Sequence, residues 1–211
     1  MDNIEEIISK LSQDSVATNA APHPGILSLK WIGWAVCYIF LSLMISGLRP
    51  DIMIKLHEQL FIAEVAVLIG IFIATSISAA LLSFPDMHQM PKLTLLPVIA
   101  FAILVLIMFL TWNADNPPAR LPVHSFECTL SIIMFSLLPA GWTFLEMRKF
   151  ASTHYHWAGS IALLSAFSAG ALWLRLHEVN DSIVHVVQWH YLPMMGIGIT
   201  GLWLGKVMLK W

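Results

Sequence analysis

Histidine, cysteine and carboxylate side chains gather near the ends of long apolar stretches in this chain of 211 residues. Glu178, His185 and His190 lie close together in sequence, and Cys128 follows His124 by four residues, about one helical turn. Neutral imidazole, thiolate and carboxylate are ligands of transition metals. These residue types are compatible with a metal site, but their spacing matches no compact ligand motif such as paired CxxC.

The same residues also have a purely structural interpretation, which the sequence favours. Histidines at a membrane interface bond to carbonyl groups while half exposed to water, and a single cysteine at the end of a span packs as a small residue. Cys37 lies in the middle of an apolar stretch and is predicted to be inert.

The composition predicts an all-α integral membrane protein. Hydrophobic residues make up 58% of the chain and charged residues 11%, and the mean hydropathy is +0.76. A globule of this size could not hide so much apolar surface, so lipid must be the solvent for much of the chain. Runs of about 20 apolar residues cross a bilayer as helices. We predict six transmembrane helices, at residues 26–48, 60–83, 93–112, 128–145, 157–176 and 188–209.

The distribution of lysine and arginine predicts the orientation of these spans. One side holds Lys10, Lys30, Lys92, Arg148, Lys149, Lys206 and Lys210. The opposite side holds Arg49, Lys55, Arg120 and Arg175. The positive-inside rule then places both termini of the multi-pass chain in the cytoplasm.

Several functional classes are excluded or disfavoured. The scattered basic residues form no stripe for nucleic acid. The sequence lacks a Gly-rich nucleotide loop, a GxSxG elbow and an HExxH pair, and no nucleophile and base share a depth in the spans, so we expect no enzyme. A role as a small multispan metal-binding or transport protein stays open as an alternative. The mostly apolar interiors of the spans disfavour it, because transport would need ligands along the path.

Residues 1–25 form a polar segment that we assign to the cytoplasm, ahead of a sensor domain at 26–211. Within residues 2–14, the apolar Ile4, Ile7, Ile8 and Leu11 fall on one face of a helix that Asn3 can cap. A short amphipathic helix needs a partner to be stable. The candidates are the bilayer surface and a groove on a soluble cytoplasmic protein.

Two further patterns concern the packing of the spans. Glu64 lies inside the second span and must be neutral or paired, and Arg49 could pair with it or with Asp51 to pin the first two spans. Arg175 could extend outward or pair with Glu178.

The last span carries a row of small residues, which predicts a helix-packing face: Gly196, Gly198, Gly201 and Gly205. The row leaves the oligomeric state open.

Short motifs along nearly the whole chain resemble one known family. They are a first span ending in residues 47–51 (Gly-Leu-Arg-Pro-Asp), Phe61 and Glu64 in the second span, Cys128 opening the fourth, residues 176–177 (Leu-His) closing the fifth, and residues 189–193 (Trp-His-Tyr-Leu-Pro) opening the sixth. This pattern is similar to the NrsF-type membrane anti-sigma factors, negative regulators of extracytoplasmic-function (ECF) sigma factors such as sigma-F.

The resemblance implies that the N-terminal segment sequesters an ECF sigma factor and that the membrane part senses envelope stress. It also implies two outer-face cysteines, of which Cys128 matches the first, whereas Glu178 stands where the second is expected. A disulfide switch between these positions is therefore absent. We expect Cys128, His177, Glu178 and His190 to form the sensor instead, with a transition-metal ion as the only candidate cofactor.

Overall fold

The computed structural model describes residues 2–13, 22–85, 92–114 and 125–210, and within these residues it contains helices and no strands, as the composition predicted. The elements in chain order are α1 (Asp2–Gln13), α2 (Pro24–Ser46), α3 (Ile52–Lys55), α4 (Gln59–Leu82), η2 (Leu93–Leu95), α5 (Leu96–Ala114), α6 (Phe126–Met147), α7 (Tyr155–His177), α8 (Ile183–Val186), η3 (Val187–Tyr191) and α9 (Leu192–Met208).

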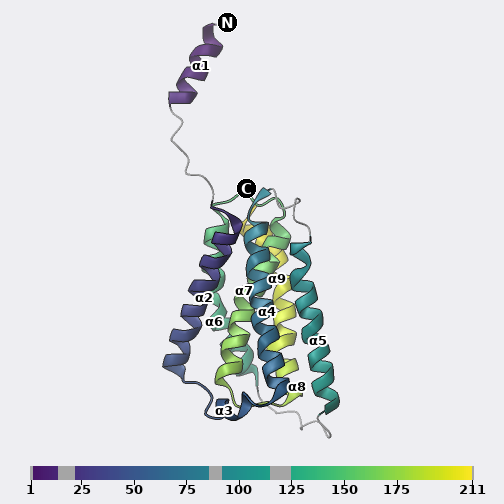
Figure 1. The fold of residues 1–211 in the computed structure, drawn as a ribbon. Helices are drawn as coiled ribbons and strands as arrows, with labels where there is room; N and C mark the ends of the chain where they lie inside the picture. The colour runs from purple at the N-terminus through teal and green to yellow at the C-terminus, as the bar shows by residue number, and fades with distance from the viewer. Residues whose placement is uncertain (1, 14–21, 86–91, 115–124, 211) are drawn as a thin grey trace.

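The long helices α2, α4, α5, α6, α7 and α9 lie side by side and run alternately in opposite directions (Figure 1). The short helices α3 and α8 lie at one end of this bundle, and the C-terminus lies at the other end with the start of α2. Four of the helices, α2, α4, α6 and α7, are long and apolar enough to cross a membrane. The apolar part of α5, Leu96–Trp112, and the 17-residue α9 are shorter, so six crossings remain a prediction.

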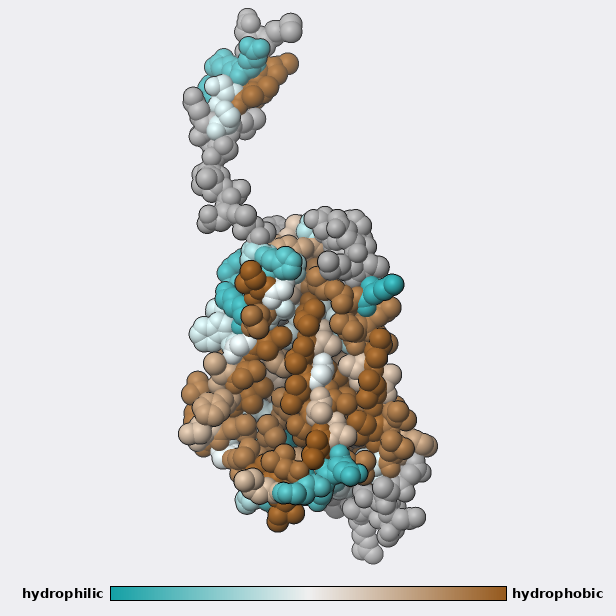
Figure 2. Space-filling view, viewed as in Figure 1, coloured by the Kyte–Doolittle hydropathy of each residue, from teal (hydrophilic) through white to brown (hydrophobic). Residues whose placement is uncertain are grey.

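The outer surface of the bundle is apolar where a bilayer would contact it. Figure 2 shows a continuous brown region over the middle of the bundle, with hydrophilic residues at its two ends. Large apolar side chains such as Ile45 and Ile199 are 89% and 70% exposed. A soluble monomer rarely exposes such a large apolar area, so this surface fits a lipid environment.

Helix α7 forms the centre of the bundle and packs against α9, α4 and α6. In its most apolar stretch 83% of the residues are buried, against 22% in α2. Many of these buried residues are small, including Ala162, Ala166 and Ala169, which lets neighbouring helices approach closely. The buried hydroxyls of Ser76 and Ser165 form a hydrogen bond of 2.8 Å that ties α4 to α7.

The predicted packing face on the last span is confirmed for three of its four glycines, Gly198, Gly201 and Gly205. A Cβ atom placed on Gly201 would lie 2.6 Å from Ser160 Cα in α7, and a Cβ atom placed on Gly159 of α7 would lie 2.4 Å from Gly205 Cα in α9. The Ser160 hydroxyl donates to the Gly198 carbonyl at 2.7 Å. Gly196 has no neighbour within 4 Å of such a Cβ and faces away from α7.

The helix starts differ slightly from the predicted ones. Helix α2 begins at Pro24, two residues before the predicted span, because proline at the first helical position has the right φ and needs no hydrogen bond there. The His23 ring caps this helix, since its Nδ1 accepts from the Gly25 N–H at 3.1 Å. Helix α1 begins at Asp2, so Asn3 lies inside it and is not its cap.

We predict that Gly201→Val destabilises the bundle and that Gly196→Val, in the same helix, does not. The valine side chain at position 201 would overlap the α7 backbone and force α7 and α9 apart, at a cost of about 1–3 kcal/mol. Thermal unfolding in detergent, followed by circular dichroism, measures both variants. Equal midpoints for the two would contradict the assigned packing face.

Candidate functional site

A cluster of ion pairs occupies the α3/α8 end of the bundle, around Arg49. The Arg49 side chain is buried and contacts two carboxylates: Nε donates to Asp51 Oδ1 at 2.8 Å, and Nη2 donates to Asp181 Oδ2 at 2.8 Å. Its backbone N–H donates to the Leu176 carbonyl at 3.0 Å. Arg49 therefore joins the end of α2 to the end of α7 and to the segment that follows α7.

A second arginine extends this cluster into the bundle. Arg175 of α7 forms two parallel hydrogen bonds of 3.0 Å to the Glu64 carboxylate, and it also contacts Asp181. The Tyr191 hydroxyl donates to the same Glu64 carboxylate. Of the pairings left open by the sequence, Arg49 takes Asp51 and not Glu64. Glu64 is instead neutralised by Arg175, because both side chains point into the space between α4 and α7.

Asp181 is the common partner of the cations in this ion-pair cluster. Lys55 Nζ lies 2.9 Å from Asp181 Oδ2, in addition to the contacts from Arg49 and Arg175. Burial alone would raise the pKa of Asp181, but hydrogen bonds from these three cations hold that pKa well below its usual value. The hydrogen bonds to Asp51 and Asp181 raise the pKa of Arg49. Both groups are therefore charged at neutral pH.

Next to the ion-pair cluster lies a group of four potential metal ligands, Cys128, Glu178, His185 and His190, which we call the four-ligand cluster. Each offers one ligand atom, and these atoms all lie within 4.8 Å of one another. Glu178 is at the centre: the Cys128 thiol donates to its Oε1 at 3.3 Å, His185 Nε2 lies 3.0 Å from Oε1, and His190 Nε2 lies 3.1 Å from Oε2.

The four-ligand cluster draws its side chains from four different parts of the chain that meet at one end of the bundle. Cys128 lies in the first turn of α6, Glu178 directly follows α7, and His185 lies in α8. His190 lies in η3, a π-helical turn between α8 and α9; such turns contain an extra residue and recur at functional sites. The Thr129 hydroxyl donates to the Trp189 carbonyl at 2.6 Å, which holds this turn against α6.

Three of the four residues predicted as the sensor are brought together, namely Cys128, Glu178 and His190. His177 is not among them, because its Nδ1 hydrogen-bonds with the Gly47 carbonyl at 2.8 Å and its ring stacks on Trp173. His185 takes the fourth place. The sequence contained a signal for it, since His185 lies between Glu178 and His190, but the boundaries of the short α8 were needed to choose it.

The protonation states within the four-ligand cluster follow from burial and proximity. Burial would raise the pKa of Glu178, but contacts with His190, Cys128 and His185 outweigh it and lower that pKa. Burial is also the main cause that lowers the pKa of His185, in spite of the nearby Glu178 carboxylate. At neutral pH Glu178 is therefore ionised and His185 is uncharged, the forms in which both side chains ligate metals.

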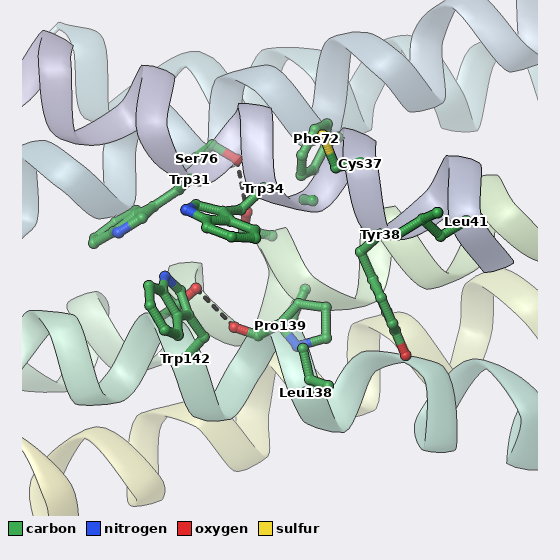
Figure 3. Close-up of a pocket in the computed structure, with 14 residues that line it drawn as sticks. Trp31, Trp34, Cys37, Tyr38, Leu41, Phe72, Ser76, Leu138, Pro139 and Trp142 are labelled. Carbon is green, nitrogen blue, oxygen red and sulfur yellow. Dashed lines mark hydrogen bonds between the residues drawn. The ribbon is translucent and has the colours of Figure 1, made fainter.

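A cavity of about 250 Å³ lies between α2 and α6, towards the opposite end of the bundle from the four-ligand cluster (Figure 3). Its walls are mostly apolar and include the aromatic rings of Trp31, Trp34 and Tyr38 from α2 and Trp142 from α6. Figure 3 shows Cys37 at its α4 side, near Phe72. The cavity offers apolar contacts but no cluster of titratable groups, so its chemistry is that of packing.

The four apolar residues predicted to bind a partner all lie in α1. Ile4, Ile7 and Ile8 are 64%, 49% and 60% exposed, and the placement of the Leu11 side chain lies outside the described part of the chain. Figure 2 shows the apolar side chains on one side of α1 and hydrophilic ones on the other. The helix thus presents an apolar stripe that the bundle does not cover.

The described part of the chain is a helical bundle with an apolar outer surface and with buried charges at one end. This architecture suits a membrane environment. The chain belongs to the NrsF family, described as negative regulator of sigma F, which matches residues 11–211. This confirms the family resemblance found in the sequence, and it makes a sigma factor the implied partner and negative regulation the implied activity. No curated protein and no solved structure matches the chain.

We predict that Arg175→Met destabilises the protein by about 3–5 kcal/mol, because Glu64 would be left buried with no cation beside it. The double variant Arg175→Met/Glu64→Met should recover part of this loss, since no unpaired charge remains. Lys149→Ala serves as the control, because Lys149 is exposed and its partner Glu146 also has Lys30. Thermal unfolding in detergent measures all three, and a double variant no more stable than Arg175→Met would contradict the pairing.

The lowered pKa of Asp181 predicts how acid affects the protein. A carboxyl group of this kind stabilises the fold above its unfolded pKa of about 3.9, and this contribution is lost as the pH falls towards the folded value. The stability difference between wild type and Asp181→Asn should stay constant from about pH 7 to pH 5 and shrink below about pH 4. Unfolding midpoints across this range test it, with exposed Glu5→Gln as control. A difference that is independent of pH would refute the assignment.

Proposed function

We propose that this protein is a membrane-embedded anti-sigma factor that sequesters an ECF sigma factor through its cytoplasmic segment 1–25 and releases it in response to an envelope stress. The family match supports negative regulation of a sigma factor. The single observation that carries the sequestration step is the uncovered apolar stripe of α1.

Helix α1 suits a protein groove better than a lipid surface. Its polar face carries Glu5 and Glu6 against a single cation, Lys10, which pairs with Glu6 at 3.2 Å. Anionic headgroups attract helices with basic polar faces and repel this one. An amphipathic helix in an apolar groove buries residues at i, i+3, i+4 and i+7, which is the spacing of Ile4, Ile7, Ile8 and Leu11. The family match begins at residue 11, so this assignment depends on the helix itself.

The orientation proposed from the basic residues is compatible with the bundle. The start of α2 and the C-terminus lie at the same end (Figure 1). With that end in the cytoplasm of a bacterium, α1 can meet a sigma factor, and the ion-pair cluster and the four-ligand cluster face the periplasm. Such an arrangement separates the group that detects a signal from the helix that holds the partner.

The four-ligand cluster also favours a second candidate, a small metal-binding or transport protein of the inner membrane. A transporter would need further ligands along its path. Within the described ranges, this cluster is the only group of three or more such side chains placed to share an ion. We therefore rank this function second.

The decisive experiment substitutes residues in α1. We predict that Ile8→Asp releases the sigma factor, because a buried contact residue at the centre of an interface typically contributes at least about 2 kcal/mol, or roughly a thirtyfold change in affinity. A reporter gene driven by the cognate sigma factor should switch on without any stress, and co-purification of the sigma factor from membranes should fall.

The matched control is Ser9→Asp, which adds the same charge to the polar face of the same helix. It should leave the reporter silent. A silent reporter in both variants, with both proteins present at wild-type levels in the membrane, would rule out sequestration by α1. A metal-binding or transport protein would keep its activity when residues 2–13 are deleted.

A further inference from the structure

We infer that Cys128, Glu178, His185 and His190 form a binding site for a divalent transition-metal ion of the zinc type. One thiolate, one carboxylate and two neutral imidazoles carry a total charge of −2, which a divalent ion neutralises. Four ligands suit the tetrahedral geometry of zinc, with bonds of about 2.0–2.3 Å. In a tetrahedral zinc site the ligand atoms lie roughly 3.3–3.8 Å from one another. The four ligand atoms here all lie within 4.8 Å of one another, so small side-chain rotations would bring them to these distances.

The two histidines supply an independent observation that points to a ligand. Each side chain is only 1% exposed. Nevertheless, both ring nitrogens of His190 and the Nε2 of His185 are buried without a hydrogen bond of acceptable geometry, although Glu178 lies nearby. A buried polar atom without a partner is costly. A metal ion bound by His185 Nε2 and one ring nitrogen of His190 gives a partner to two of these three nitrogens and so removes most of this cost.

The surroundings orient the ligands as metal sites require. The Ser125 hydroxyl lies 3.0 Å from His185 Nδ1, which fixes the ring and leaves Nε2 free for the metal, the usual role of the residues behind a ligand. Thiolate and imidazole favour zinc-type ions over magnesium or calcium, which prefer oxygen. On binding, Cys128 loses its thiol proton to solvent and a sulfur–metal bond replaces the contact with Glu178.

The position of the site links it to the ion-pair cluster. Glu178 precedes Asp181 in the same short segment, and His190 precedes Tyr191, which bonds to Glu64. A metal that draws Glu178 and His190 together therefore pulls on two members of the cluster that anchors α2 through Arg49. The regulatory part of this inference rests on the proposed function: metal occupancy is the signal that changes how tightly α1 holds the sigma factor.

The test uses the purified full-length protein in detergent with Co²⁺ as a spectroscopic probe. Wild type should bind one Co²⁺ per chain with the absorption of a tetrahedral, thiolate-ligated ion, and Zn²⁺ should displace it. Cys128→Ser should lose the thiolate band, and His190→Ala should weaken binding at least a hundredfold. Size-exclusion profiles identify any variant that fails to fold.

Matched controls come from the same chain. His177→Ala removes a histidine at the same end of the bundle but outside the four-ligand cluster, and Cys37→Ser removes the other thiol; both should bind Co²⁺ like wild type. Absence of tetrahedral Co²⁺ in wild type would overturn the site. An unchanged spectrum in Cys128→Ser, or loss of binding in His177→Ala, would overturn the assigned ligands.

A reporter experiment separates the site from the proposed function. External Zn²⁺ should switch on the sigma-factor promoter in wild type and not in Cys128→Ser. If Co²⁺ binds but Ile8→Asp leaves the promoter silent, the sequestration model fails and the metal site stands. If Ile8→Asp switches the promoter on but wild type binds no metal, the metal site fails and sequestration stands. Binding without a Zn²⁺ response in wild type overturns the regulatory role.

Discussion

The constraint on which this structure depends is that charges placed at the edge of an apolar bundle must neutralise one another. Asp181 forms ion pairs with three cations, Arg49, Lys55 and Arg175. Because Arg49 follows α2 and Arg175 belongs to α7, one carboxylate fixes the end of the outer helix to the central one. Removing Arg175 would leave Glu64, which is almost fully buried, as a charge without a partner, a cost of several kcal/mol. Non-directional apolar packing could not fix the helix ends in this way.

The four-ligand cluster inherits its geometry from this ion-pair cluster. Glu178 leaves α7 with an extended backbone, and the chain can then reach Asp181, which the cations hold in place. From there α8 and the π-helical turn η3 direct His185 and His190 back towards Cys128. The ligands are thus positioned by charges that they do not contact directly. A change in the four-ligand cluster must be absorbed by the segment that carries Asp181.

Much of the fold could be predicted from the sequence, because apolar runs and their interruptions are local properties. The site was predicted less completely. Cys128, Glu178 and His190 could be selected by residue type and by their position at helix ends. The choice of His185 over His177 depends on where α7 ends. His177 is the last residue of α7 and contacts Gly47, whereas His185 lies in the separate short helix α8. The pairing of Glu64 with Arg175 likewise depends on which faces of α4 and α7 meet, a long-range property that periodicity alone does not fix.

Helix α2 is the element through which the two ends of the molecule can communicate. It starts at Pro24, after the segment that contains α1, and ends at Ser46, three residues before Arg49. Only 22% of its most apolar stretch is buried, against 83% in α7, and a cavity of about 250 Å³ separates part of it from α6. A helix with few buried contacts moves at a smaller cost than one in the core, whereas α7 and α9 are locked by close glycine contacts. A displacement that starts at Asp181 can therefore pass along α2 towards Pro24, which adjoins the N-terminal segment that we propose binds the sigma factor.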